Sequence, residues 1–247
     1  MIAADPPPIA LVTGASSGIG RAVARRLCDR GMRVAGCARR HERLEQLADE
    51  LGDRFLPVRC DLTSLDQIDR MFAAITSRWG GLDILVNNAG FGRKAPLLAF
   101  EPEIWRDILA VNVLALSVCT QKVIESMRRR GVAGHVIHIS SMSAHRVPGG
   151  SGMYSASKFA VRSLTESLRQ ELREAGSDIR ISSISPGFVE TEFAERYHGD
   201  EAAARATYAQ YPVLQPTDIA DAVQFILEAP AHVQYHDLLV RPTRQAS

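Results

Sequence analysis

The chain has 247 residues, of which 46% are hydrophobic and 23% are charged, as is typical of one globular domain. Its 29 Lys and Arg residues nearly cancel its 28 Asp and Glu residues, so the net charge of +1 favours neither a nucleic-acid partner nor an anionic membrane. No apolar run reaches bilayer length and residues 1–10 do not resemble a signal peptide, so we expect a cytoplasmic protein.

A glycine-rich loop follows the first expected strand. Residues 9–13 are an apolar run that suits a buried parallel strand, and residues 22–31 have a helical pattern. Between them, the sequence TGASSGIG places Gly14 at a tight turn, Gly18 where backbone approaches a pyrophosphate, and Gly20 where the helix packs on the strand. The spacing is GxxxGxG rather than GxGxxG, and an ordinary strand-to-helix turn is the alternative.

The end of the second expected strand, residues 33–38, bears on the choice of dinucleotide. NAD-binding proteins usually place an acid there to hold the ribose hydroxyls, but this chain has Ala38 followed by Arg39 and Arg40. A missing carboxylate and an added guanidinium both favour a 2′-phosphate, and therefore NADP(H). The alternative is that the two arginines are solvated residues at the start of the next helix.

Two further strands, residues 54–60 and 82–87, end in Asp61-Leu62 and in Asn87-Asn88-Ala89-Gly90. Small residues and amides at a strand end would let a cofactor pass close by, although Asn87 alone could instead tie neighbouring loops together. The following residues 103–130 have the pattern of a long helix, with Asn112 in its apolar stretch. Since an unpaired amide is costly to bury, we expect Asn112 to have a partner or a role.

A tyrosine and a lysine lie four residues apart at the start of another long helical pattern, residues 154–175, which follows a strand at 135–139 and a serine-rich segment. Tyr154 and Lys158 therefore share one face of the helix. An ammonium beside a phenol lowers the pKa of the tyrosine, which can then exchange a proton near neutral pH. Taken alone, the spacing fits two surface residues equally well.

The rest of the chain continues the alternation. We expect a strand at residues 178–185, an irregular or weakly helical segment at 192–215, a helix at 216–227 and a last strand at 236–240. Alternating strands and helices predict an α/β fold whose parallel sheet is covered on both faces. No linker or repeat divides residues 1–247. The cysteines lie in apolar contexts, which favours reduced core residues over a disulfide or metal site; they are Cys28, Cys37, Cys60 and Cys119.

Taken together, these segments resemble the short-chain dehydrogenase/reductase family over the whole chain. The matching segments are TGASSGIG at 13–20, DL at 61–62, NNAG at 87–90, Asn112, ISS at 139–141, YSASK at 154–158 and PGFVET at 186–191. The tail is similar to that of NADP-dependent members such as clavulanic acid dehydrogenase, bacterial 3-hydroxy acid dehydrogenases and animal carbonyl and steroid reductases. Each segment is common, but their order and spacing together are specific.

The resemblance implies a three-layer Rossmann fold with a doubly wound, seven-stranded parallel sheet, and a homodimer or homotetramer. It implies an NADP(H)-dependent oxidoreductase that interconverts a carbonyl and an alcohol by hydride transfer. The catalytic residues implied are Asn112, Ser141, Tyr154 and Lys158, with Ser140 and Ser143 excluded by spacing. The cofactor-binding residues implied are Gly14, Ser16, Ser17, Gly18, Ile19, Gly20, Arg39, Arg40, Asp61, Leu62, Asn88, Ala89, Gly90, Tyr154, Lys158, Pro186, Gly187, Val189 and Thr191.

Two other functions stay open at this point: a nucleotide-sensing module without chemistry, and a sugar-nucleotide epimerase or dehydratase, whose family shares the YxxxK pattern. We expect the substrate to be a small carbonyl or alcohol, bound in a pocket lined by residues 91–94, 142–150 and 188–215, with a lid at about 189–215. Charged residues in these segments would favour an anionic substrate or would be solvated; they are Arg93, Lys94, His145 and Arg146. Apolar residues would line a hydrophobic pocket or the core; they are Phe91, Met142, Val147, Met153 and Phe188.

Overall fold

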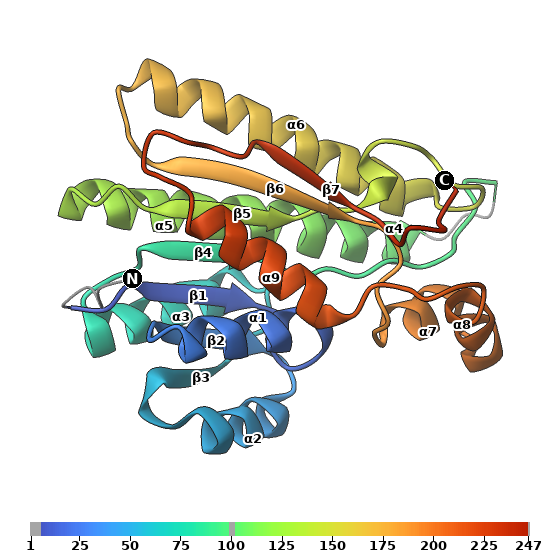
Figure 1. Cartoon of the computed structure of the whole chain (residues 1–247), viewed down its shortest axis with the longest axis horizontal. Helices are drawn as coiled ribbons and strands as arrows, with labels where there is room; N and C mark the ends of the chain where they lie inside the picture. The colour runs from blue at the N-terminus through green and yellow to red at the C-terminus, as the bar shows by residue number, and fades with distance from the viewer. Residues whose placement is uncertain (1–5, 99–101, 247) are drawn as a thin grey trace.

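The computed structural model describes residues 6–98 and 102–246. Within these ranges lies a parallel sheet of seven strands in the order β3-β2-β1-β4-β5-β6-β7, with helices on both faces (Figure 1). The strands are β1 (Ile9–Thr13), β2 (Arg33–Ala38), β3 (Phe55–Arg59), β4 (Ile84–Asn87), β5 (His135–Ile139), β6 (Arg180–Pro186) and β7 (Asp237–Val240). The predicted doubly wound, seven-stranded sheet is confirmed.

The helices begin at residues that suit a helix start. The Ser64 hydroxyl accepts a hydrogen bond from the Gln67 amide at the start of α3, and Gln215 and Asp218 cap α9 reciprocally. In chain order, the helices are α1 (Gly18–Asp29), α2 (His41–Leu51), α3 (Leu65–Trp79), α4 (Pro102–Leu109), α5 (Leu116–Arg130), α6 (Gly152–Glu174), α7 (Phe193–His198), α8 (Glu201–Tyr208) and α9 (Pro216–Leu227).

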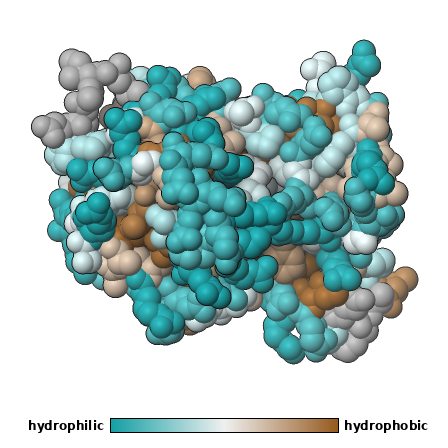
Figure 2. Space-filling model, turned by 90° about the horizontal axis from the view of Figure 1, so that it is seen from below, coloured by the Kyte–Doolittle hydropathy of each residue, from teal (hydrophilic) through white to brown (hydrophobic). Residues whose placement is uncertain are grey.

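Each face of the sheet has its own apolar core. Ala10 and Val12 of β1 point to the core under α1, α2 and α9, whereas Ile9 and Leu11 point to the core under α3, α5 and α6. Burial on both faces explains why these strands are continuous apolar runs rather than alternating ones. The four cysteines are buried and carry free thiols, as expected. Away from the cores, the face seen in Figure 2 is largely hydrophilic, with only small hydrophobic patches.

The longest helical stretch is continuous from Pro102 to Arg130, because a π-helical segment (Ala110–Ala115) joins α4 to α5. By length and composition this helix could cross a membrane, so the expectation that no apolar stretch reaches bilayer length is wrong. Cys119, Val123 and Met127 of α5 pack into one core of the sheet. We therefore interpret its apolar character as that of a helix that covers a sheet.

The lid contains two short helices. Residues 192–215, which the sequence predicts to be irregular or weakly helical, include α7 and α8. The two ends of the lid are tied together by a bridge between Val189 and Leu214. The Tyr208 hydroxyl donates to the Thr191 carbonyl oxygen at 3.1 Å, which holds α8 against the start of the lid.

Strand order reverses between β1 and β4, because the chain first builds outward through β2 and β3 and then crosses back. The loops that follow β1 and β4 therefore run in opposite directions from neighbouring strands. In open α/β sheets this point, at the carboxyl ends of the strands, is where ligands bind. The glycine-rich loop, the NNAG segment and the serine-rich segment all follow strands at this edge.

Candidate active site

A cavity of about 1290 Å³ lies at this edge of the sheet. It extends from the glycine-rich loop after β1 to the lid. Gly20 and Asn112 are the only two expected site residues that do not line it. The expected residues that do line it are Gly14, Ser16, Ser17, Gly18, Ile19, Arg39, Arg40, Asp61, Leu62, Asn88, Ala89, Gly90, Ser141, Tyr154, Lys158, Pro186, Gly187, Val189 and Thr191.

The glycine-rich loop closes tightly on the NNAG segment. The Asn88 side-chain amide donates to the Thr13 carbonyl oxygen at 2.8 Å, and the Thr13 hydroxyl accepts from the backbone amides of Asn88 and Ala89. A Cβ added at Gly20 would collide with the Asn88 amide and with the Gly14 carbonyl. Gly20 therefore packs against the loop backbone and Asn88, and Thr13 has a structural role that the sequence did not indicate. Asn87 ties neighbouring segments together, which is the alternative to a cofactor role, since its amide donates to the buried Thr120 hydroxyl at 2.9 Å.

At the far end of the cavity, Arg40 rather than Arg39 is bound to the glycine-rich loop. The Arg40 guanidinium donates to the Ser17 hydroxyl at 2.7 Å and to the Ser16 hydroxyl at 3.3 Å. Arg39 is exposed beside the cavity. Hydrogen bonds from Thr63, with a smaller contribution from the Arg39 charge, hold the pKa of the Asp61 carboxyl below its ordinary value. Position 38 itself carries no carboxylate; the carboxylates at this corner are those of Asp61 and of Glu192, which accepts from Arg40 at 2.8 Å.

At the lid end, α6 places Tyr154 and Lys158 against β5. The Lys158 ammonium donates to the Ile139 carbonyl oxygen at 3.0 Å and lies 5.9 Å from the centre of the Tyr154 ring. Burial lowers the pKa of Lys158 from 10.5 to about 8, because a charged amine is disfavoured away from water. The lysine is therefore fixed by a backbone carbonyl of the sheet as well as by its helix.

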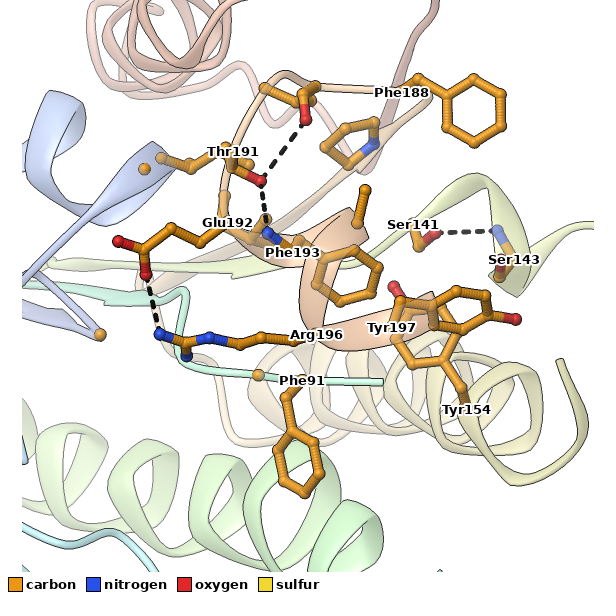
Figure 3. A pocket seen from close by; sticks show the side chains of 18 of the residues that line it. Phe91, Ser141, Ser143, Tyr154, Phe188, Thr191, Glu192, Phe193, Arg196 and Tyr197 are labelled. Carbon is orange, nitrogen blue, oxygen red and sulfur yellow. Dashed lines mark hydrogen bonds and ion pairs between the residues drawn. The ribbon is translucent and has the colours of Figure 1, made fainter. Parts of the chain in front are cut away.

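The lid covers the catalytic tyrosine expected from the sequence. The rings of Phe193 and Tyr197 lie with centroids 5.4 and 5.8 Å from that of Tyr154 (Figure 3). Burial raises the pKa of Tyr154 to about 12, a hydrogen bond with Ser141 acts in the opposite direction, and Tyr197 raises it further. The expectation that Lys158 lowers this pKa is wrong for this arrangement of the lid, because burial under the lid disfavours the charged phenolate and raises the pKa instead.

The three serines after β5 have distinct surroundings. The Ser141 hydroxyl accepts from the Ser143 amide at 3.0 Å and lies beside Tyr154 (Figure 3). Ser143 also lines the cavity, as expected. The buried Ser140 hydroxyl has no hydrogen-bond partner among the described residues, although it lines the same cavity. Of the three, Ser141 is the serine that the structure pairs with the tyrosine.

Asn112 has the partner that its mid-helix position required. It lies in the π-helical segment, where its side-chain oxygen accepts from the Phe91 amide and its nitrogen donates to the Phe91 carbonyl oxygen, at 3.0 and 2.9 Å. Its nitrogen also donates to the Ser157 hydroxyl at 3.0 Å. Asn112 thus ties the loop after β4 to α6, next to the turn that carries Lys158.

The expected substrate segments divide into cavity residues and others. Phe91, Lys94, Met142, Arg146 and Phe188 line the cavity. Of the other candidates, Arg93, Val147 and Met153 do not. His145 is turned toward the sheet, where its ring contacts the Ser185 hydroxyl at 3.1 Å and the Asp237 carboxylate at 3.2 Å. Of the four charged residues expected near the substrate, only Lys94 and Arg146 therefore line the cavity, and the lid adds aromatic rings.

The end of the chain contributes a residue that the sequence did not indicate. Gln245 is buried, and its side-chain oxygen accepts from the Phe188 amide at 3.0 Å. A Cβ added at Gly187 would collide with the Gln245 amide and lie close to Pro242. The tail therefore fixes the loop that follows β6, where PGFVET lines the cavity. A single glutamine 57 positions away along the chain gives no local signal for such a contact.

These residues fit a dinucleotide with a 2′-phosphate. The amides at the start of α1 suit the pyrophosphate, and Ser16, Ser17 and the two arginines suit the additional phosphate. Gly14 and Gly18 line the cavity without a side chain, so at these two positions the backbone of the loop can lie against the pyrophosphate. At the other end of the same cavity, Tyr154 and Ser141 suit the oxygen of a substrate.

Comparisons with known proteins agree with this geometry. A family profile described as short chain dehydrogenase matches residues 8–202. The human protein named dehydrogenase/reductase SDR family member 11 is 50% identical, over 97% of this chain and 95% of its own length. The NADP-dependent 3-hydroxy acid dehydrogenase YdfG of Salmonella typhi is 36% identical over 96% of both chains.

A solved structure described as the closed form of serine dehydrogenase complexed with NADP+ has a TM-score of 0.92 and 36% identity, over 97% of this chain and 96% of that chain. The similarity in sequence and in structure therefore covers nearly the whole chain. These relatives favour neither the nucleotide-sensing module nor the epimerase. The chain is an NADP(H)-dependent oxidoreductase, and it belongs to the short-chain dehydrogenase/reductase family.

Proposed function

We propose that Ser141, Tyr154 and Lys158 carry the interconversion of a carbonyl and an alcohol at the lid end of the cavity. The observation that supports this assignment is that the three side chains meet where the cavity is continuous with the glycine-rich loop. The cofactor, when bound, supplies or accepts the hydride. The remaining work of the reaction is to hold the substrate oxygen and to move a proton to or from it.

Each residue has a separate task in this proposal. The Ser141 hydroxyl donates a hydrogen bond to the substrate oxygen and orients it. The Tyr154 hydroxyl gives that oxygen its proton during reduction and takes it back during oxidation. Lys158, held by the Ile139 carbonyl, stabilises the phenolate and binds the ribose next to the nicotinamide. Asn112 holds the loop after β4 in place and, as the family implies, a water that connects Lys158 to solvent.

The assignment is tested by following NADPH absorbance with a panel of ketones, aldehydes and hydroxy acids. The farnesol dehydrogenase of Aedes aegypti, 42% identical over 95% of both chains, adds long apolar alcohols to the panel. We expect apolar or aromatic carbonyls to be the better substrates, because rings from the lid dominate the pocket wall. A preference for small anionic hydroxy acids would instead indicate that Lys94 and Arg146 bind the substrate.

The two serines provide a matched pair of variants. Ser141→Ala is expected to lower kcat by about 10²–10³-fold, because it removes a donor to the reacting oxygen. Ser143→Ala removes the same hydroxyl group two residues away and is expected to change kcat only slightly. Steady-state kinetics of both variants, with NADPH binding as the control for folding, make the comparison. A larger loss in Ser143→Ala would contradict the assignment of Ser141.

Cofactor preference is expected to depend on the end of β2. A guanidinium that grips the 2′-phosphate is worth about 10- to 100-fold in affinity, and a carboxylate at position 38 would repel that phosphate. The double variant Ala38→Asp/Arg39→Leu is therefore expected to prefer NADH. The measurement is kcat/KM for both cofactors. Arg59→Leu, which removes an exposed guanidinium from β3 outside the cavity, is the control and is expected to keep the parent preference.

We also propose that the protein is a cytoplasmic homodimer or homotetramer. Large apolar side chains are exposed along the long helices, namely Leu109, Leu114, Phe159 and Leu164. Phe225 of α9 and Leu239 of β7 form a second such region, and an apolar face of this kind is usually covered by another subunit. Light scattering at micromolar concentration is expected to give at least twice the monomer mass of 27.0 kDa. A monomer would contradict the proposal.

A further inference from the structure

The Glu192 carboxylate accepts hydrogen bonds from three arginines that belong to three different parts of the fold. Its Oε2 accepts from Arg40 at the end of β2 and from Arg196 of α7, both at 2.8 Å, and its Oε1 accepts from Arg43 of α2. The link between Glu192 and Arg196 is drawn in Figure 3. A single negative charge is thus shared by three positive ones, and the cluster keeps a net positive charge.

Arg40 connects this cluster to the proposed 2′-phosphate site. The same guanidinium that donates to Glu192 also donates to the hydroxyls of Ser17 and Ser16 in the glycine-rich loop. A carboxylate and a phosphate monoester present similar pairs of anionic oxygens to a guanidinium. Partial burial on its own raises the pKa of the Glu192 carboxyl, but hydrogen bonds from Arg43 and Arg40 lower it to about 2, so the carboxylate is ionised at neutral pH.

Glu192 is also connected to the other end of the cavity. It is the residue immediately before α7, the helix that carries Phe193 and Tyr197 over the Tyr154 ring. The backbone of that helix is fixed at one further point, where the Lys94 amide donates to the Tyr197 carbonyl oxygen at 2.8 Å. The ion pairs of Glu192 are therefore a direct link between the arginines at the adenosine end and the aromatic cover of the catalytic tyrosine.

We propose that Glu192 competes with the cofactor's 2′-phosphate for Arg40. This inference rests on the proposed assignment of the two β2-end arginines to that phosphate. Binding of NADP(H) then separates Glu192 from Arg40, whereas a dinucleotide without the 2′-phosphate leaves this ion pair in place. Glu192 is thereby a specificity-determining residue that acts through cofactor affinity.

The variant Glu192→Gln removes the competing charge and keeps the size of the side chain. Adenosine 2′,5′-bisphosphate is the probe, because it carries the 2′-phosphate without the nicotinamide, and adenosine 5′-monophosphate is the reference without that phosphate. An exposed ion pair is worth up to about fivefold in an equilibrium constant. Calorimetric titration is expected to show roughly two- to fivefold tighter binding of the bisphosphate to the variant and unchanged binding of the monophosphate.

Glu195→Gln is the matched control, because Glu195 is an exposed carboxylate of the same helix and makes no ion pair with these arginines among the described residues. It is expected to bind both probes as the parent does. Unchanged or weaker bisphosphate binding in Glu192→Gln would overturn the competition, as would equal tightening in Glu195→Gln. If the parent itself does not prefer the bisphosphate over the monophosphate, the phosphate assignment fails, and the competition fails with it.

Discussion

Tyr154→Phe is expected to fold and to bind NADPH as the parent does, while its kcat falls by about 10²–10⁴-fold. The substitution removes only the hydroxyl that exchanges the proton. The ring keeps its contacts with Phe193 and Tyr197, and Gly92 still packs directly against it. Turnover is measured from NADPH absorbance with the best substrate of the panel, and binding is measured separately by fluorescence.

Tyr197→Phe is the control for this result. It removes a second phenolic hydroxyl from the same cavity wall and leaves the aromatic cover intact. Its kcat is expected to stay within a few-fold of the parent value, as is usual for a group that does not take part in proton transfer. Near-parent turnover in Tyr154→Phe, or an equal loss in both variants, would show that the proton comes from another group.

Lys158→Met is expected to lose both turnover and NADPH affinity, because the ammonium serves the tyrosine and the ribose at once. The methionine keeps most of the side-chain volume but cannot donate to the Ile139 carbonyl. Lys122→Met, on α5 and outside the cavity, removes the same charge and is the control. If Lys158→Met bound NADPH as tightly as the parent does, Lys158 would not be a ligand of the ribose.

The same variant has an expected effect on stability. Because the pKa of Lys158 falls from 10.5 to about 8 on folding, the unfolded chain binds this proton more tightly between those pH values. The free energy of unfolding of the parent therefore gains a positive slope with pH from about 8 to 10.5, which Lys158→Met lacks. Urea unfolding at pH 7.5 and 9.5 measures the difference. If the free energy of unfolding depended on pH in the same way in both proteins, folding would not lower the pKa of Lys158.

The strands were the most predictable part of the fold. The bounds of β1, β2 and β5 match the expected ranges to the residue, because each is a buried apolar run between residues that break strands. The bounds of the other strands were less certain: β4 and β6 each begin two residues later than expected, and the outermost strands β3 and β7 each begin one residue later. The order of the catalytic segments was predictable as well, since each follows a strand at the carboxyl edge.

The lid was not predictable from local pattern. Helices of six and eight residues are unstable alone, and these two depend on distant contacts such as the bridge from Val189 to Leu214 and the bond between Tyr208 and Thr191. The pKa of Tyr154 depends on that lid, so the spacing of Tyr154 and Lys158 predicted their proximity but not the dominance of burial. Glu192 escaped notice for the same reason, because its partner Arg40 lies 152 positions away.

The position of Gln245 has a practical consequence for how the protein is handled. In a parallel sheet, a chain that enters at the amino end of one strand and leaves after another has its two ends at opposite edges, as Figure 1 shows. Here the last described residues leave β7 on the cavity side, and Arg244, Gln245 and Ala246 line the cavity. A purification tag fused to the carboxyl end would therefore follow residues that line the active site. Ile9, where β1 begins, lies at the opposite edge of the sheet, so a tag on the amino-terminal side is expected to leave the loop after β6 undisturbed.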